Sequence, residues 1–516
     1  MQNQKISYLI LIIMVLLLIP VYYLSLTTPF RLIDDYTTWM IHGDLIKYLS
    51  FSSEGRSYPI YEYYNEITWS LFQTDYSLHH LTRLLVKILT FLLIFKLGKE
   101  LCPLNVKKYE WSSFIFIFSL YFFYPNNPEA RLAPQELLSA FFLFFTTYFI
   151  VNKQTYSKKI FIILIGFICF LLSKESNIII GFLLFTFITY RIIKSSTHNY
   201  WIIPFVIVFT HTFINIYLIT SKGGYGQANI SLALISNNLS SLTEFILFPG
   251  GSYDPFILIF LLITPTYLII KKTPSLVKNI SLTGFWHDNK NIIFVTLLFV
   301  AAIATYSLSW HKVLRYAYLP TLLFHLLIYF SLRYILQNNL WSKLFSNMNF
   351  FSLIFVLIVF SNFYYQFFLQ NFAGNFEKRL LNTIEIEANK NSIYLVDNSE
   401  YSHKILIYFT EFRDKYFPEK NKLKIARGKK IKGSLDYDFM LTRKENYVKK
   451  NIEKIGKNNI RIIEPTDDLL PCYHSFLMKV NQWVHLRNWI GKKHNYLWSD
   501  SGAQYPFKWH FVRNRK

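Results

Sequence analysis

The 516-residue chain contains few charged residues, few glycines and prolines, and almost no cysteine. Charged residues make up 16% of it, whereas soluble domains usually contain about 25%. With 17 glycines and 17 prolines, the chain is not collagen-like, and with 3 cysteines it is not a disulfide scaffold. Cys102, Cys169 and Cys472 lie far apart, in different kinds of segment, so they predict neither a disulfide framework nor a metal cluster.

Apolar residues dominate instead. Hydrophobic residues reach 52% and aromatic residues 19%, with 50 Phe and 37 Tyr. A single soluble domain could not bury so much apolar surface, and long uncharged runs predict an α-helical polytopic membrane protein. Hydropathy predicts about eleven spanning helices, near residues 7–29, 83–101, 111–125, 135–152, 160–173, 177–193, 201–220, 254–270, 292–309, 317–336 and 350–370.

The net charge of +23 predicts orientation rather than nucleic-acid binding, because no nucleic-acid-binding motif accompanies it. Lysines and arginines, Arg333 among them, fall in loops on one side, which the positive-inside rule makes cytoplasmic. We therefore expect a transmembrane domain at 1–370, with a long first outer loop at about 30–82, and a small extracytoplasmic α/β domain at 371–516. In that domain, strands are predicted near 391–397, 422–426, 437–442 and 460–463, and a helix near 401–412.

The first outer loop opens with the adjacent acids Asp34 and Asp35, directly after the first span. Two neighbouring carboxylates repel each other unless one holds a proton, a cation or a cationic partner. This pair therefore predicts a general base or a metal ligand, and the alternative is a solvated helix cap. The next outer loop carries Glu129, Arg131 and Glu136 at a helix start, which predicts either functional charges or a local ion pair.

Two later outer segments carry cations. Lys174 and Glu175 stand in a short turn, where the alternative reading is a capped turn with side chains that snorkel to the interface. His311, Lys312 and Arg315 follow the ninth span, and these cations suit a phosphate, although headgroup anchoring explains them as well. Acids and cations from four loops thus converge on the outer face. That arrangement predicts a site for an anionic, lipid-linked substrate.

The ordered set of these stretches resembles the GT-C superfamily of integral-membrane glycosyltransferases, over about residues 1–330. Within it, the set is most similar to the protein O-mannosyltransferase and TMTC-type families and their bacterial relatives. The stretches are Asp34-Asp35, Glu54-Gly55-Arg56-Ser57-Tyr58-Pro59, Pro128-Glu129-Ala130 with Arg131 and Glu136, and Ser173-Lys174-Glu175-Ser176. The helical-repeat tail of TMTC proteins and the WWD motif of oligosaccharyltransferases are both lacking.

The resemblance implies a GT-C-like fold and transfer of a sugar from a polyprenyl-phosphate carrier to a lipid, glycan or protein hydroxyl. It implies Asp34 or Asp35 as the base, and Glu129, Glu136 and Glu175 as supporting acids. The carrier phosphate would be held by Arg56, Arg131, Lys174, His311, Lys312 and Arg315. The resemblance does not fix a cofactor, because some relatives bind a divalent cation and others do not; here Asp35 and Glu129 could hold Mg²⁺ or Mn²⁺.

The expected location is a bacterial inner (plasma) membrane, with the active site and tail on the extracytoplasmic side and with membrane lipids as partners. Two alternatives stay open. A lipid-linked saccharide polymerase or ligase would also use cations on the outer face. A transporter would place ionisable residues near mid-membrane, where this sequence has only His211 and His325.

Overall fold

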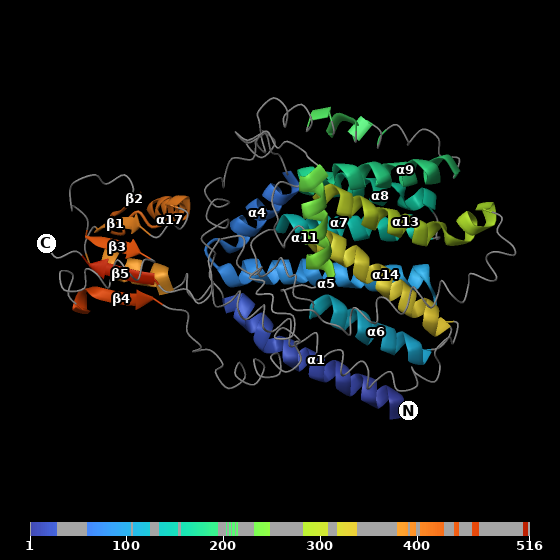
Figure 1. Ribbon diagram of the computed structural model, residues 1–516, viewed down its shortest axis with the longest axis horizontal. Coiled ribbons are helices and arrows are strands. Elements are labelled where there is room, and N and C mark those ends of the chain that lie inside the picture. Colours follow the sequence, from blue (N-terminus) through green and yellow to red (C-terminus); the bar gives the residue numbers. More distant parts are fainter. Residues whose placement is uncertain are drawn as a thin grey trace.

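A computed structural model describes residues 2–27, 59–104, 107–123, 134–152, 156–194, 232–247, 282–307, 317–337, 379–390, 393–398, 403–427, 438–442, 457–463 and 509–513, with scattered residues at 203–214. A helical bundle precedes an α/β unit that lies beside one end of it (Figure 1). The bundle holds α1 (Gln2–Thr27), α4 (Pro59–Phe72), α5 (Tyr76–Leu101), α6 (Lys107–Phe122), α7 (Pro134–Val151), α8 (Tyr156–Ser173), η2 (Glu175–Asn177), α9 (Ile178–Lys194), α11 (Leu232–Leu247), α13 (Leu282–Ser307) and α14 (Tyr318–Gln337).

Local sequence explains several helix ends. Pro59 and Pro134 open α4 and α7, where a missing N–H leaves no hydrogen bond unmade. Asp75 caps α5, since its Oδ1 accepts hydrogen bonds from the amides of Ser77 at 2.9 Å and Leu78 at 3.3 Å. Gln73 has a left-handed φ of 47° and ends α4 with a sharp turn.

The expected membrane fold is wrong. Across the described residues, none of the helices combines the length and the apolar character that crossing a bilayer requires. One physical reason is that several segments predicted from hydropathy to span a membrane contain buried charged residues, which interrupt their apolar runs. Arg83 and Lys87 lie inside α5, and Arg333 lies inside α14, each at most 3% exposed. The prediction of about eleven spanning helices in a GT-C-like membrane domain is therefore corrected.

Helices nevertheless occur at eight of the predicted segments, as α1, α5, α6, α7, α8, α9, α13 and α14. Two of the described α-helices of the bundle were not predicted. α4 lies within the expected first loop, and α11 lies between two predicted spans. The predicted segments at 254–270 and 350–370 lie outside the described residues, and 201–220 is described only in part. The predicted domain boundary at 370 also falls there and stays a prediction.

Contacting pairs fix the direction of the helices from α7 onward. Glu136 at the start of α7 meets Lys174 just after α8, so these two helices are antiparallel. α9 and α13 are antiparallel as well, with the rings of Phe187 and Phe294 stacked at 3.8 Å and Lys174 near Tyr306 at the end of α13. The end of α8 and of α13 and the start of α7 and of α9 therefore share one end of the bundle, which we call the Lys174 end.

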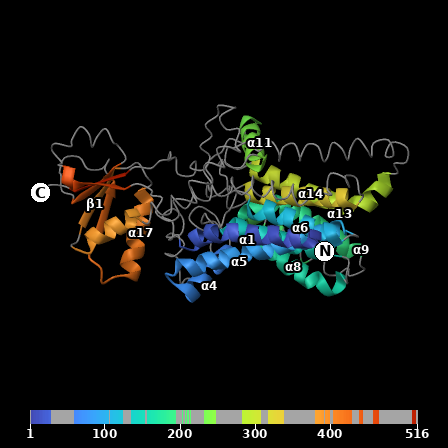
Figure 2. The ribbon, with the colours of Figure 1, turned by 90° about the horizontal axis from the view of Figure 1, so that it is seen from below.

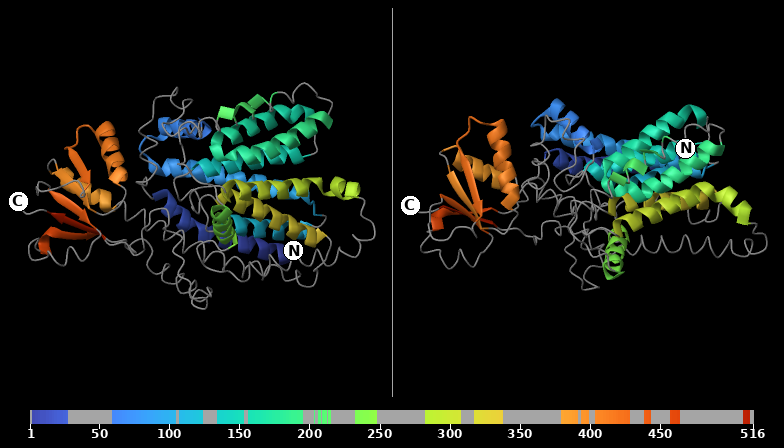
Figure 3. Two further views of the ribbon diagram at one scale, coloured as in Figure 1. Left: turned by 45° about the horizontal axis from the view of Figure 1, so that its top comes forward. Right: turned by 90° about the horizontal axis from the view of Figure 1, so that it is seen from above.

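The remaining helices follow the same order. The α1 backbone at Leu26 accepts a hydrogen bond from Ser77 at the start of α5, and α6 runs parallel to α1 and antiparallel to α5. Gly98 of α5 lies against the ring of Tyr329 in α14, where a Cβ would overlap the ring, and this contact brings the two parallel helices close together. The ends of α1 and α6 and the starts of α5 and α14 thus also lie at the Lys174 end, as Figure 2 and Figure 3 allow the reader to follow.

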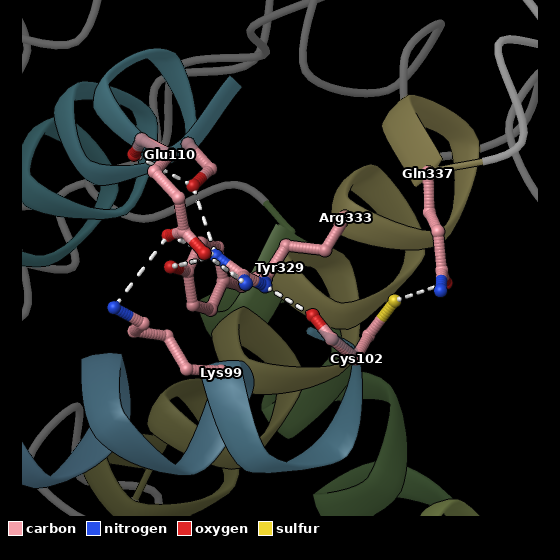
Figure 4. Close-up of polar contacts among 7 residues, drawn as sticks. Lys99, Cys102, Glu110, Tyr329, Arg333 and Gln337 are labelled. Atoms are coloured by element: carbon pink, nitrogen blue, oxygen red, sulfur yellow. Dashed lines mark hydrogen bonds and ion pairs between the residues drawn. The ribbon is translucent and has the colours of Figure 1, made fainter. Parts of the chain in front are cut away.

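At the opposite end of the bundle, Arg333 of α14 connects this helix to α6 and to the end of α5 (Figure 4). Its guanidinium is fully buried and binds Glu110 of α6 through two hydrogen bonds of 2.8 and 2.9 Å. It also donates to the Cys102 carbonyl at 2.7 Å, to Ser113 and to the Tyr329 hydroxyl. Arg333 was predicted to be a charge of a cytoplasmic loop, and that interpretation is wrong because its side chain links three helices inside the protein.

The C-terminal unit contains β1 (Ile393–Asn398), α17 (His403–Tyr416), β2 (Leu423–Arg427), β3 (Phe439–Thr442), η6 (Lys457–Asn459), β4 (Ile460–Ile463) and β5 (Trp509–Arg513). The strand order is β2-β1-β3-β5-β4, with β1 parallel to β2 and β3, and β5 antiparallel to β3 and β4. The four predicted strands and the predicted helix are present, whereas β5 was missed. Its hydrogen bonds come from strands at least 46 residues earlier, so no local pattern marks it.

The C-terminal unit contacts the bundle through aromatic rings. Trp69 of α4 lies 4.9 Å from the Tyr416 ring and 6.2 Å from the Phe412 ring of α17, measured between ring centroids. α17 lies on the side of the sheet that faces the bundle (Figure 3). The contact therefore places the C-terminal unit at the Lys174 end, beside α4.

Candidate functional site

The Lys174 end contains a buried ion pair. The Lys174 ammonium donates to Glu136 Oε1 at 2.5 Å, and the two side chains are 5% and 1% exposed. The ammonium also lies 5.4 Å from the ring centroid of Tyr306 in α13. Burying two charges is unfavourable unless they are paired, and here the attraction between the ammonium and the carboxylate offsets the cost of removing both from water. Because Lys174 is buried, it is not a lysine that snorkels to a surface.

A second polar contact lies one turn further along α7. Asn177 donates to the Ser139 hydroxyl at 3.0 Å and to the Phe170 carbonyl at 2.7 Å. Ser139 follows Glu136 by three residues and therefore shares its face of α7. Within the part of the chain that the structure describes, two buried acceptors at this location, Glu136 Oε2 and Asn177 Oδ1, have no hydrogen-bond donor. The segment from Lys174 to Asn177 is thus held to α7 by two side chains, with acceptor capacity left over.

α13 and α11 adjoin this pair. Asn238 of α11 donates to the Ser307 carbonyl at 2.9 Å, at the end of α13. This bond connects α11 to the turn of α13 that holds Tyr306. Four helices therefore contribute to one polar region at the Lys174 end, and among the described side chains its charges are those of Glu136 on α7 and Lys174 after α8.

α4 and the first turns of α5 form a neighbouring group of titratable side chains. Burial raises the pKa of Glu62 to about 7. Burial lowers the pKa of His79 to about 4, and its Nε2 lies 2.9 Å from the Gln73 carbonyl. Tyr64 shares a hydrogen bond of 2.9 Å with Thr82, and burial raises its pKa. A carboxyl group with a pKa near 7 exchanges protons readily at neutral pH, which suits acid–base work.

The structure describes few of the predicted site residues. It brings Glu136 and Lys174 together, and Glu175 belongs to η2. The others lie outside the described residues: Asp34, Asp35, Arg56, Glu129, Arg131, His311, Lys312 and Arg315. These eight residues stand in segments 28–58, 124–133 and 308–316. The described helix ends that border these segments are the ends of α1, α6 and α13 and the starts of α4, α7 and α14. All of them except the start of α4 belong to the Lys174 end.

Sequence reasoning did not select Glu62, Asn65 or Tyr306. Glu62 stands in a segment taken for a loop, so no helical face was considered for it. A signal was present in the sequence, because Pro59 followed by apolar residues at helical spacing is typical of a helix start. Among the described residues, no group of three or more His, Cys, Asp or Glu is placed to hold a metal ion. The predicted metal ligands Asp35 and Glu129 lie outside that part, so the metal stays a prediction.

Comparison with known proteins adds no relative: no family model, no curated protein and no solved structure matches this chain.

Proposed function

We propose that the protein is a glycosyltransferase that moves a sugar from a polyprenyl-phosphate carrier to an acceptor hydroxyl at the Lys174 end of the bundle. The observation that carries this proposal is convergence. Lys174 and Glu136, 38 residues apart, meet in a buried contact. Of the six described helix ends that border segments 28–58, 124–133 and 308–316, five belong to this end of the bundle, and the start of α4 is the exception. Paired groups of opposite charge, as in Lys174 and Glu136, suit an anionic substrate with a leaving phosphate.

The proposed reaction is a displacement at the anomeric carbon of the sugar. The acceptor oxygen forms a bond to that carbon while the bond from the carbon to the carrier phosphate breaks. The acceptor proton passes to a carboxylate, for which Asp34 and Asp35 are the candidates. The carrier leaves as a phosphate anion, and cationic side chains stabilise the charge that develops on it.

Lys174 is one of those cations, and its pairing with Glu136 has a consequence for binding. A phosphate oxygen competes with the Glu136 carboxylate for the same ammonium group. The ion pair would keep a buried cation in place while the substrate is absent. Arg131, Lys312 and Arg315 remain candidates for the other phosphate contacts.

A contact of α1 with membrane lipids is part of this proposal. Leu9, Ile12, Leu16 and Ile19 of α1 form one stripe and are 55–58% exposed, while Met14 on the opposite face is fully buried. Exposed apolar stripes of this kind mark a contact with a partner. We commit to lipid acyl chains as that partner, because the proposed donor itself carries a polyprenyl chain.

Flotation of the protein with vesicles of phosphatidylcholine and phosphatidylglycerol tests the lipid contact. Burial of one leucine side chain contributes about 1.5–3 kcal/mol, so a Leu9→Ser/Leu16→Ser variant should bind vesicles at least roughly tenfold more weakly. Leu232→Ser, which changes an exposed leucine of α11, is the control and should bind normally. Equal flotation of the wild type and the α1 variant would remove the lipid contact from the proposal.

The proposed reaction is tested with the purified full chain, a polyprenyl-phosphate sugar and a lipid extract that offers acceptor hydroxyls. Mass spectrometry should detect a product heavier than its acceptor by one sugar residue, together with free polyprenyl phosphate. Release of free sugar without a glycosylated product would indicate hydrolysis instead of transfer. Absence of both products across several sugar donors would contradict the proposed function.

A further inference from the structure

Two buried polar atoms on α4 lack partners among the residues that the structure describes. Glu62 Oε2 accepts no hydrogen bond, and Asn65 Nδ2 donates none. Asn65 is 5% exposed, so water does not simply cover the amide. A buried polar atom without a partner is unfavourable, and such atoms are rare enough in folded proteins to need an explanation.

The two atoms complement each other. Glu62 and Asn65 are three residues apart on a helix, which places their Cβ atoms about 5–6 Å apart on neighbouring positions of one face. Two side chains at such positions can reach one common group. The bridging group has to donate to the carboxylate and accept from the amide. A hydroxyl does both, whereas an ammonium group cannot accept and a fully ionised phosphate cannot donate.

We propose that Glu62 and Asn65 together bind one hydroxyl group of the acceptor substrate. That the bound molecule is the acceptor rests on the proposed function, whereas its need for a hydroxyl group rests only on the two side chains. The pair orients a hydroxyl-bearing molecule beside α5, α7 and α8, against which α4 packs. α7 and α8 are also the helices that position Glu136 and Lys174, so the proposed hydroxyl site and the proposed transfer site share two helices.

The charge state of Glu62 supports this assignment. Its pKa of about 7 has burial as its cause. Charged and titratable groups of α4 and of the elements packed against it include Glu66 on the same helix, His79, His80 and Arg83 of α5, Glu136 of α7, and Lys174, which follows α8. None of them appears among the causes of the shift. A hydroxyl that donates to the carboxylate stabilises its ionised form and should therefore lower the pKa of Glu62 toward its ordinary value.

Infrared titration of the carboxyl groups of the full-length protein tests the site directly. Octyl β-glucoside is the probe, since it offers hydroxyl groups and carries no charge. In the wild type we expect the carboxyl group of Glu62 to titrate near pH 7, and saturating probe should move its midpoint downward. Glu62→Gln should abolish this titration, whereas the matched control Glu66→Gln on the same helix should keep both the titration and the response.

Asn65→Leu separates hydroxyl binding from burial. This variant should keep the titration of Glu62, which also shows that α4 is folded, but lose most of the response to the probe. Asn65→Ala is the second variant in case leucine disturbs packing. The proposal would be overturned if the probe did not move the wild-type midpoint. It would also be overturned if the probe moved the midpoint in both Asn65 variants as far as in the wild type. Either result would mean that water alone fills the site.

Kinetics distinguish this inference from the proposed function. Loss of one hydrogen bond to a charged group weakens binding about ten- to a hundredfold. Glu62→Gln and Asn65→Leu should therefore raise the KM for the acceptor and leave the KM for the sugar donor unchanged. If the wild type transfers no sugar but its titration still responds to the probe, the hydroxyl site stands and the glycosyltransferase proposal fails. Transfer with unchanged acceptor KM in both variants rejects the site alone.

Discussion

Replacing Lys174 by Met should destabilise the protein by about 3–5 kcal/mol, because it leaves the Glu136 carboxylate buried without its partner. Thermal unfolding of the full-length protein measures the effect. Lys159→Met, at the other end of α8, is the matched control and should change stability little, since the contact described for its ammonium is with the Phe149 ring, 5.6 Å away.

The double variant Glu136→Leu/Lys174→Met separates stability from function. Replacing both members of a buried ion pair with apolar residues is often neutral or stabilising, so most of the lost stability should return. Sugar transfer should nevertheless stay at least roughly tenfold below the wild type, because a phosphate contact is lost. A stable double variant with full transfer would assign the pair a structural role only.

Replacing Arg333 by Met should also destabilise the protein by about 3–5 kcal/mol, since Glu110 and the Cys102 carbonyl lose their donor at the opposite end of the bundle. Arg333→Lys should recover part of this loss, because lysine lacks the fork that binds both carboxylate oxygens. Lys99→Met is the control. Its ammonium is half exposed and 4.0 Å from Glu110, so the expected change is under about 1 kcal/mol.

The Arg333 contact also predicts a dependence on pH. Burial raises the pKa of Glu110, but the hydrogen bonds and charge of Arg333 outweigh burial, so the pKa lies below its ordinary value of 4.5. The stabilisation is therefore fully present above pH 4.5 and is lost as the pH falls through the lowered pKa. Arg333→Met should flatten the decline in unfolding temperature over that acidic range. An unchanged pH profile would show that Glu110 does not contribute to it.

The helix positions could be predicted, and the pairing of their charges could not. Apolar runs long enough for a helix identify α6, α7, α8 and α9 within a few residues, because a helix of this kind is encoded locally. Arg333 and Glu110 are 223 residues apart, so nothing near Arg333 in the sequence distinguishes a buried ion pair from a loop cation. The partner of Glu136 could not be predicted either. The sequence suggested a local ion pair as one of two interpretations, whereas the residue in contact is Lys174, 38 positions away.

The candidate site was predicted in part for a related reason. Lys174 and Glu136 attract notice because charges next to apolar runs are conspicuous. Glu62 and Asn65 do not, because polar residues are ordinary in a segment taken for a loop. Their significance depends on α4 being a helix packed on the bundle, which buries Glu62 Oε2 and Asn65 Nδ2. Burial of these two atoms depends on how α4 packs against the bundle, and no local sequence pattern indicates it.

The most direct test of the central claim is the rate of sugar transfer by Asp34→Asn and Asp35→Asn. Asparagine keeps the size of the side chain and caps a helix about as well as aspartate, but it cannot act as a base. A general base contributes about 10²–10⁴-fold, so we expect one of the two variants to lose at least a hundredfold in transfer with an unchanged unfolding temperature. If both variants keep more than about a tenth of the wild-type rate, neither residue is the base, and the proposed mechanism is contradicted.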